Sequence, residues 1–156
     1  MTLLWSFDPG QATGWAVGSY GPNTPYKRIN AGIIPGAAQG LKDWWGQGSG
    51  SKLIAGDTVV SESFTLNSGN EFVADTTPRE VEGALIVLWD GDINWQSRAA
   101  KAGVPDDLLK AHNLWLTGKD VDWEDGRDAN DATIHALEYL RRKRHLPTLR
   151  HYFRED

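Results

Sequence analysis

Four acidic residues stand where folding could bring their carboxylates together. Asp8 ends an apolar run before Pro9, Glu62 lies within another apolar run, and Asp128 and Asp131 are three positions apart. Clustered carboxylates have raised pKa values unless cations neutralise them, and their hard oxygen atoms suit Mg²⁺, with Mn²⁺ as a substitute. Two such ions about 3.5–4 Å apart can activate water and stabilise the leaving oxygen in phosphodiester cleavage. These four residues are therefore candidate metal ligands and catalytic residues of a phosphoryl-transfer site.

Each of these acids also has a purely structural explanation. Asp8-Pro9-Gly10 is a common turn sequence. A period of two places Val60, Glu62 and Phe64 on one strand face, where Glu62 needs a partner, although an edge-strand Glu can instead reach solvent. Acids at a helix start cap its free amides and complement its dipole. Only the convergence of all four favours chemistry over these alternatives.

The hydrophobic pattern predicts the elements that must position the acids. The predicted strands are β-rich runs bounded by turn residues, and they cover residues 2–8, 13–19, 26–34, 57–63 and 92–96. The predicted helices cover residues 37–45, 81–89, 106–112 and 128–144. This order predicts an α/β fold with a five-stranded mixed sheet, three antiparallel strands at its start and helices on both faces. At 156 residues, we expect one domain, 1–156.

The last predicted helix carries both an apolar stripe and two of the acids. Its apolar residues recur at helical spacing, at Ala129, Ala132, Ala136, Leu137 and Leu140. This stripe is expected to face the sheet, with Asp128 and Asp131 at its border. The helix would then bring them to Asp8 and Glu62 at one end of the domain. The run at 81–89 is apolar nearly all round, which predicts a helix buried on most faces.

Composition excludes several classes of protein. The chain has no cysteine, which rules out disulfides and thiolate zinc sites, and no apolar run approaches the ~20 residues of a membrane span. The start lacks the features of a secretory signal, so we expect a cytoplasmic protein. The net charge of −5 argues mildly against nucleic acid. However, six acids against one arginine in residues 120–131 contrast with a basic end, so metal and polyanion binding are compatible.

Three motifs occur in order: Asp8-Pro9-Gly10 with Gly14, Val59-Val60-Ser61-Glu62, and Asp128-Ala129-Asn130-Asp131. They resemble motifs of the RuvC family of Holliday-junction resolvases, which have a ribonuclease-H-like fold. The resemblance implies a homodimer that nicks two strands of a four-way junction and leaves 5′-phosphate and 3′-hydroxyl ends. It also implies two Mg²⁺ ions at the matching acids and a dimer contact through residues 81–89, although burial in a monomer explains that run equally well. Small size and abundant Trp are compatible with a bacteriophage version, in the host cytoplasm.

The resemblance also suggests DNA-contacting residues. Lys101 falls where the family has a DNA-contacting lysine, although an exposed lysine is the plain alternative. Of the aromatics after Glu62, Phe72 is the better candidate to stack at the branch point, because Phe64 shares a face with core residues. Residues 104–107 lack the family's further lysines. The basic run at the helix end, either phosphate-binding or complementary to the helix dipole, comprises Arg141, Arg142, Lys143 and Arg144.

Several alternatives remain open from the sequence. His135 stands one turn beyond Asp131 and is a candidate for proton transfer, although most such histidines are surface residues. The same chemistry would serve a nuclease for replication forks, flaps or RNA–DNA hybrids, or a packaging-type nuclease. An actin-like ATPase would need two lobes and a longer chain. A non-catalytic nucleic-acid-binding domain is a further reading, against which the presence of all four acids counts.

Overall fold

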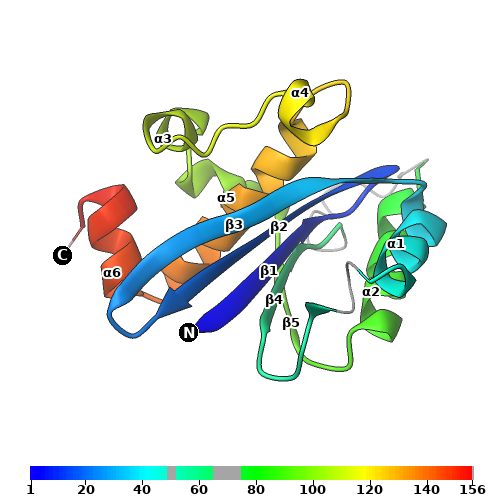
Figure 1. The fold of residues 1–156 in the computed structure, drawn as a ribbon, viewed down its shortest axis with the longest axis horizontal. Coiled ribbons are helices and arrows are strands. Elements are labelled where there is room, and N and C mark those ends of the chain that lie inside the picture. The colour runs from blue at the N-terminus through cyan, green and yellow to red at the C-terminus, as the bar shows by residue number, and fades with distance from the viewer. Residues whose placement is uncertain (49–51, 65–74, 156) are drawn as a thin grey trace.

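The computed structural model describes residues 1–48, 52–64 and 75–155. Its five strands form one mixed sheet in the order β3-β2-β1-β4-β5 (Figure 1). β1 (Thr2–Asp8), β2 (Ala12–Gly21) and β3 (Thr24–Pro35) are antiparallel neighbours. β4 (Thr58–Glu62) runs parallel to β1, and β5 (Ile93–Gln96) runs parallel to β4. The predicted five-stranded mixed sheet is confirmed.

Helices cover both faces of this sheet, as predicted. α1 (Ala37–Gly46) and α2 (Thr77–Leu88) pack together on one face, and α5 (Arg127–Arg142) crosses the other (Figure 1). Alternation along β1 separates two apolar layers, because Leu4 joins the cluster of α5 whereas Trp5 joins that of α1 and α2. The remaining short helices are η3 (Arg98–Gly103), α3 (Asp106–Ala111), α4 (Gly118–Val121), α6 (Leu146–Thr148) and η4 (Leu149–Phe153).

Within the described ranges, no helix has the length and apolar character needed to cross a bilayer.

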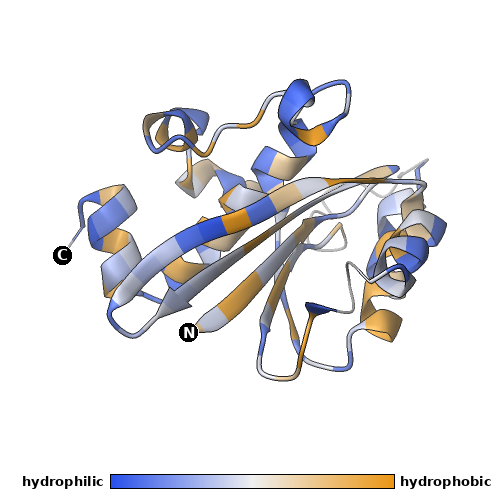
Figure 2. Ribbon diagram, in the orientation of Figure 1, coloured by the Kyte–Doolittle hydropathy of each residue, from blue (hydrophilic) through white to orange (hydrophobic). Residues whose placement is uncertain are grey.

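The prediction that residues 81–89 are buried on most faces is wrong for one side of α2. Val81 and Leu85 are buried against the sheet and α1, but Ile86 is 57% exposed and Val87 is 83% exposed. Figure 2 shows the hydrophobic colour on the last turns of this helix. A helix on the face of a sheet buries only the stripe that it turns toward its neighbours. The opposite stripe of α2 is therefore an exposed apolar surface.

The first turn of α5 lies against the backbone of β2 at Gly14. Gly14 pairs with Asp8 across β1 and β2. A Cβ atom built on Gly14 would lie 1.9 Å from the carbonyl oxygen of Asp128 and 2.1 Å from its carbonyl carbon. Backbone atoms cannot rotate away as a flexible side chain can. The missing side chain at Gly14 therefore allows the first turn of α5 to lie directly over the end of β1.

We predict that Gly14→Ala separates α5 from the sheet and destabilises the fold. Overpacking at a backbone contact typically costs about 1–3 kcal/mol, and the clash here is severe. Urea unfolding should show this loss. The matched control is Gly83→Ala on the exposed side of α2, where nothing lies within 4 Å of the added Cβ atom. This control should be neutral or stabilising by about 0.5–1 kcal/mol. Equal stability of the two variants would contradict the proposed contact.

Candidate active site

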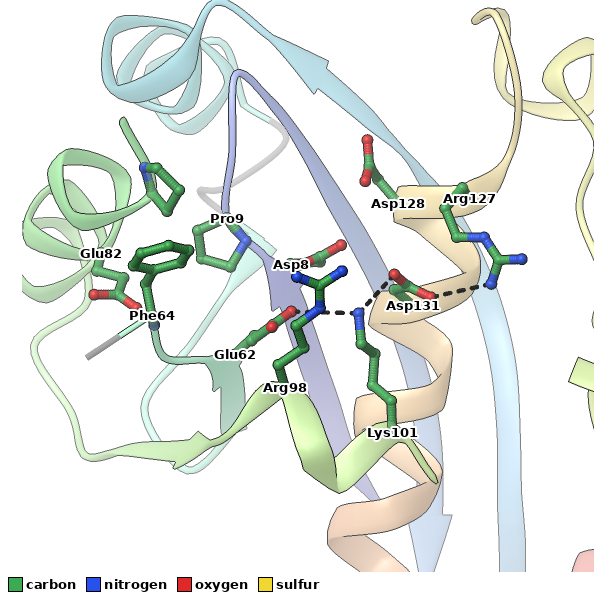
Figure 3. Close-up of a pocket in the computed structure, with 11 residues that line it drawn as sticks. Asp8, Pro9, Glu62, Phe64, Glu82, Arg98, Lys101, Arg127, Asp128 and Asp131 are labelled. Carbon is green, nitrogen blue, oxygen red and sulfur yellow. Dashed lines mark hydrogen bonds and ion pairs between the residues drawn. The ribbon is translucent and has the colours of Figure 1, made fainter. Parts of the chain in front are cut away.

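The four acids selected from the sequence line one pocket of about 320 Å³ (Figure 3). Asp8 ends β1, Glu62 ends β4, and Asp128 and Asp131 belong to the first turns of α5. Glu62 and Asp131 are buried, with 8% and 7% of their surface exposed. The convergence expected from the sequence is therefore present, while the assignment of these residues as metal ligands stays a prediction.

Sheet topology explains why these residues meet. β1 and β4 are parallel neighbours with Phe7 opposite Ser61, so Asp8 and Glu62 emerge side by side at the same edge. The contact of α5 with Gly14 places Asp128 over that edge. Asp131 follows three residues later, on the same side of the helix.

Glu62 rests on a buried polar pair. The Nε2 atom of His135 lies 3.4 Å from Oε2 of Glu62, and its Nδ1 atom lies 2.7 Å from Oε1 of Gln96. Gln96 in turn donates to the backbone carbonyl of His135 at 3.2 Å. The His135 side chain has no exposed surface and lies beneath Glu62. This location suits orientation of Glu62, and the proton-transfer role expected of His135 stays a prediction.

Lys101, expected from the sequence to contact DNA, lies among the acids. Its Nζ atom is 2.9 Å from Oδ2 of Asp131 and 3.7 Å from Oε2 of Glu62. The ammonium therefore offsets part of the negative charge of the pocket in this structure, and a DNA contact by Lys101 stays a prediction.

Sequence reasoning missed two further cations, Arg98 and Arg127, that line the pocket (Figure 3). Arg127 bridges Asp106, at 3.0 and 3.1 Å, and Asp131, at 3.5 Å. Two features of the sequence could have pointed to them: Arg127 is adjacent to Asp128, and Arg98 stands three positions before Lys101. The lining of this acidic pocket therefore also contains two positively charged arginines.

The charges of the pocket shift the pKa values of its acids. Burial, followed by a hydrogen bond and charge repulsion from Glu62, raises the pKa of Asp8 well above its usual range. Burial and the charges of Asp131 and Asp125 raise that of Asp128. Burial opposes ionisation of Glu62, but hydrogen bonds with His135 and Asp8 and the charge of Lys101 lower its pKa to about 2. The pocket thus holds more negative charge than it readily tolerates.

This donor set fits a hard divalent cation in its chemistry. Carboxylate oxygens are the ligands that Mg²⁺ and Mn²⁺ prefer, and an ammonium already stands between two of them. Across the described ranges, no group of three or more His, Asp or Glu side chains is arranged to hold a metal ion. The carboxylates would therefore have to shift for such an ion to bind.

The aromatic side chains after Glu62 differ from expectation. Phe64 was predicted to lie in the core, but it is only partly buried and lines the pocket beside Pro9 (Figure 3). β4 ends at Glu62, so the two-residue alternation no longer applies at Phe64. Its backbone N–H instead donates to the buried carboxylate of Glu82, a pocket residue that sequence reasoning missed. Phe72 lies outside the described residues.

The basic run lies at the other end of α5, which has 16 residues and therefore a length of about 24 Å. Arg141 and Arg142 both pair with Glu138, at 3.4 and 2.8 Å. Lys143 and Arg144 line a separate surface pocket. Their expected contact with DNA phosphates stays a prediction, and it would have to occur far from the four carboxylates.

We predict that the stabilising effect of ionised Glu62 depends on pH. Because its pKa is lowered from 4.5 to about 2 on folding, this contribution is complete above pH 4.5 and is lost as the pH falls toward 2. In the presence of a chelator, urea unfolding should show wild type more stable than Glu62→Gln by on the order of 3 kcal/mol at pH 7. The difference should shrink below pH 4.5. A difference that is constant from pH 7 to pH 3 would contradict this account.

Comparison with known proteins places this arrangement in a known fold. No protein-family model matches the sequence, and no curated protein matches it. Thermus thermophilus RuvC has a solved structure with a TM-score of 0.61 and 12% identity, covering 91% of this chain and 96% of that one. T. thermophilus RuvC in complex with a Holliday junction substrate gives a TM-score of 0.57 and 11% identity, covering 92% and 98%. The chain therefore has the RuvC-like form of the ribonuclease-H-like fold.

Proposed function

We propose that the chain is a Mg²⁺-dependent endodeoxyribonuclease that resolves four-way junctions and leaves 5′-phosphate and 3′-hydroxyl ends. The observation that carries this proposal is the convergence of Asp8, Glu62, Asp128 and Asp131 in one pocket of a RuvC-like fold. The solved RuvC complex with a Holliday junction substrate supports branched DNA as the partner.

The proposed chemistry assigns distinct tasks to the residues of the pocket. Asp8, Glu62, Asp128 and Asp131 would hold two Mg²⁺ or Mn²⁺ ions, which when bound supply an activated water and stabilise the leaving oxygen. His135 orients Glu62 through its Nε2 atom.

The positive and apolar parts of the border serve the substrate. Arg98 and Arg127 at the border attract the phosphodiester, because cations beside a cleft steer anionic substrates toward it. Phe64 presents an aromatic ring at the same border, where a base displaced from a junction can stack.

The main alternative keeps this chemistry and changes the substrate to replication forks, flaps or other branched DNA. A non-catalytic nucleic-acid-binding domain is less well supported. Such a domain would have no reason to retain four acids at a place where burial and mutual repulsion raise the pKa of Asp8 and Asp128.

We predict that cleavage of a four-way junction requires Mg²⁺ and is lost in Asp8→Asn. The variant should be slower by at least about 10²-fold, because it removes a charged ligand oxygen from the centre of the pocket. The assay compares four-way, fork, flap and linear DNA at equal concentration. Asp107→Asn, whose side chain is 95% exposed on α3, is the matched control and should cleave normally. Equal cleavage by wild type and Asp8→Asn would contradict the proposed mechanism. A preference of the wild type for fork or flap DNA would support the alternative substrate.

A homodimer is the second part of the proposal. Ile86 and Val87 are exposed on α2, and a two-fold contact through this stripe would cover both.

We predict that the double substitution Ile86→Glu and Val87→Glu converts the dimer to a monomer, because it places four buried charges in the contact. Light scattering after size-exclusion chromatography measures the mass. Ile29→Glu changes an equally exposed isoleucine on β3 and should leave the dimer intact. A monomeric wild type, or a dimer that persists in the double variant, would contradict the role of α2.

A further inference from the structure

Lys101, the candidate DNA contact, lies between two of the candidate metal ligands. We propose that Lys101 is a displaceable internal cation: its ammonium holds Glu62 and Asp131 in the metal-free chain, competes with divalent ions, and leaves when DNA phosphates attract it. Metal loading would then depend on substrate. This inference rests on the proposed function, because it concerns the same four carboxylates.

The geometry of Lys101 is that of a shielded ion pair. Nζ lies 2.9 Å from Asp131 and 3.7 Å from Glu62, and the side chains of the three residues are 21%, 10% and 11% exposed. Charge pairs at such low exposure are screened less by salt than pairs on the surface. The pair should therefore hold its carboxylates firmly while no other cation is present.

Lys101 and a divalent ion would compete for the same oxygen atoms. Oδ2 of Asp131 accepts from Lys101, and Oδ1 faces Arg127 at 3.5 Å, so a described cation lies against each oxygen of this carboxylate. An ion bound between Asp131 and Glu62 would bring two like charges within a few ångströms in a partly buried site. That repulsion requires Lys101 to move out.

Lys101 can change its position more easily than Arg127, because Arg127 is also held by a residue outside the four acids. Arg127 has a second, two-pronged partner in Asp106, at 3.0 and 3.1 Å. The ion pairs found for Lys101 are both with pocket acids, and its ammonium ends a flexible four-carbon stem. Lys101 also lines the pocket that Arg98 borders, where a phosphodiester would approach. A phosphate there offers Lys101 an alternative anion.

This arrangement couples two binding events. If DNA draws Lys101 away, it raises the affinity for metal, and by reciprocity metal raises the affinity for DNA. Coupling between sites commonly changes affinity by about 5–150-fold.

The experiment measures Mn²⁺ binding to the full chain by electron paramagnetic resonance, without DNA and without any assay of cleavage. Lys101→Met should bind Mn²⁺ about 10-fold more tightly than wild type, since it removes the competing charge. Lys101→Arg keeps the charge and should remain close to wild type. Lys110→Met, a lysine that is 54% exposed on α3, is the control and should not change the affinity. Should Lys101→Met fail to fold by circular dichroism, Lys101→Gln gives the same test.

A second Mn²⁺ titration is made in the presence of a four-way junction. Cleavage during the titration does not remove the phosphates that attract Lys101, because nicked DNA is still a polyanion. Mn²⁺ affinity of wild type should rise toward that of Lys101→Met, and the affinity of the variant should change less. If Lys101→Met binds Mn²⁺ no more tightly than wild type does, while wild type binds Mn²⁺ and cleaves DNA normally, the proposed role of Lys101 is wrong. The proposed function would not be affected by that result. If wild type and Lys101→Met bind no Mn²⁺ and wild type cleaves without metal, both this inference and the proposed function fail.

Discussion

The close contact between Gly14 and the carbonyl group of Asp128 determines the geometry on which the site depends. It sets how near the first turn of α5 lies to the end of β1, and thereby how near Asp128 and Asp131 lie to Asp8. The parallel pairing of β1 with β4 places the remaining acid, because it brings Glu62 to the same edge of the sheet as Asp8. One backbone contact and one strand pairing thus assemble residues that are up to 123 positions apart, from Asp8 to Asp131.

This assembly has an electrostatic cost that the surroundings offset. Burial disfavours the charged form of these carboxylates and their charges repel one another, and both effects raise the pKa of Asp8. Lys101 and Arg127 supply positive charge, and His135 supplies a ring nitrogen beneath Glu62. A fold that needed only stability would fill such a position with apolar side chains. Retaining the acids at this cost is what is expected of a functional site.

α5 connects two electrically different ends of the molecule. Its first turns carry two of the four pocket acids, Asp128 and Asp131, and its last turn carries Arg141 and Arg142. Acids at the start of a helix and basic residues at its end both complement the helix dipole. The charge asymmetry visible in the sequence therefore has a structural explanation as well as a functional one. The separation also means that residues near Arg144 can serve only parts of a substrate distant from the carboxylates.

The sequence by itself determined the succession of strands along the chain, the mixed sheet with helices on both faces and the four acids, because these follow from local periodicity and from motifs whose spacing is visible in the chain. Tertiary structure decided the rest. Phe64 lies outside the core because β4 ends two residues before it. Ile86 is exposed because only one side of α2 packs against its neighbours. Lys101 entered the acid cluster because η3 passes beside α5. Such placements depend on contacts between distant segments, which local patterns do not encode.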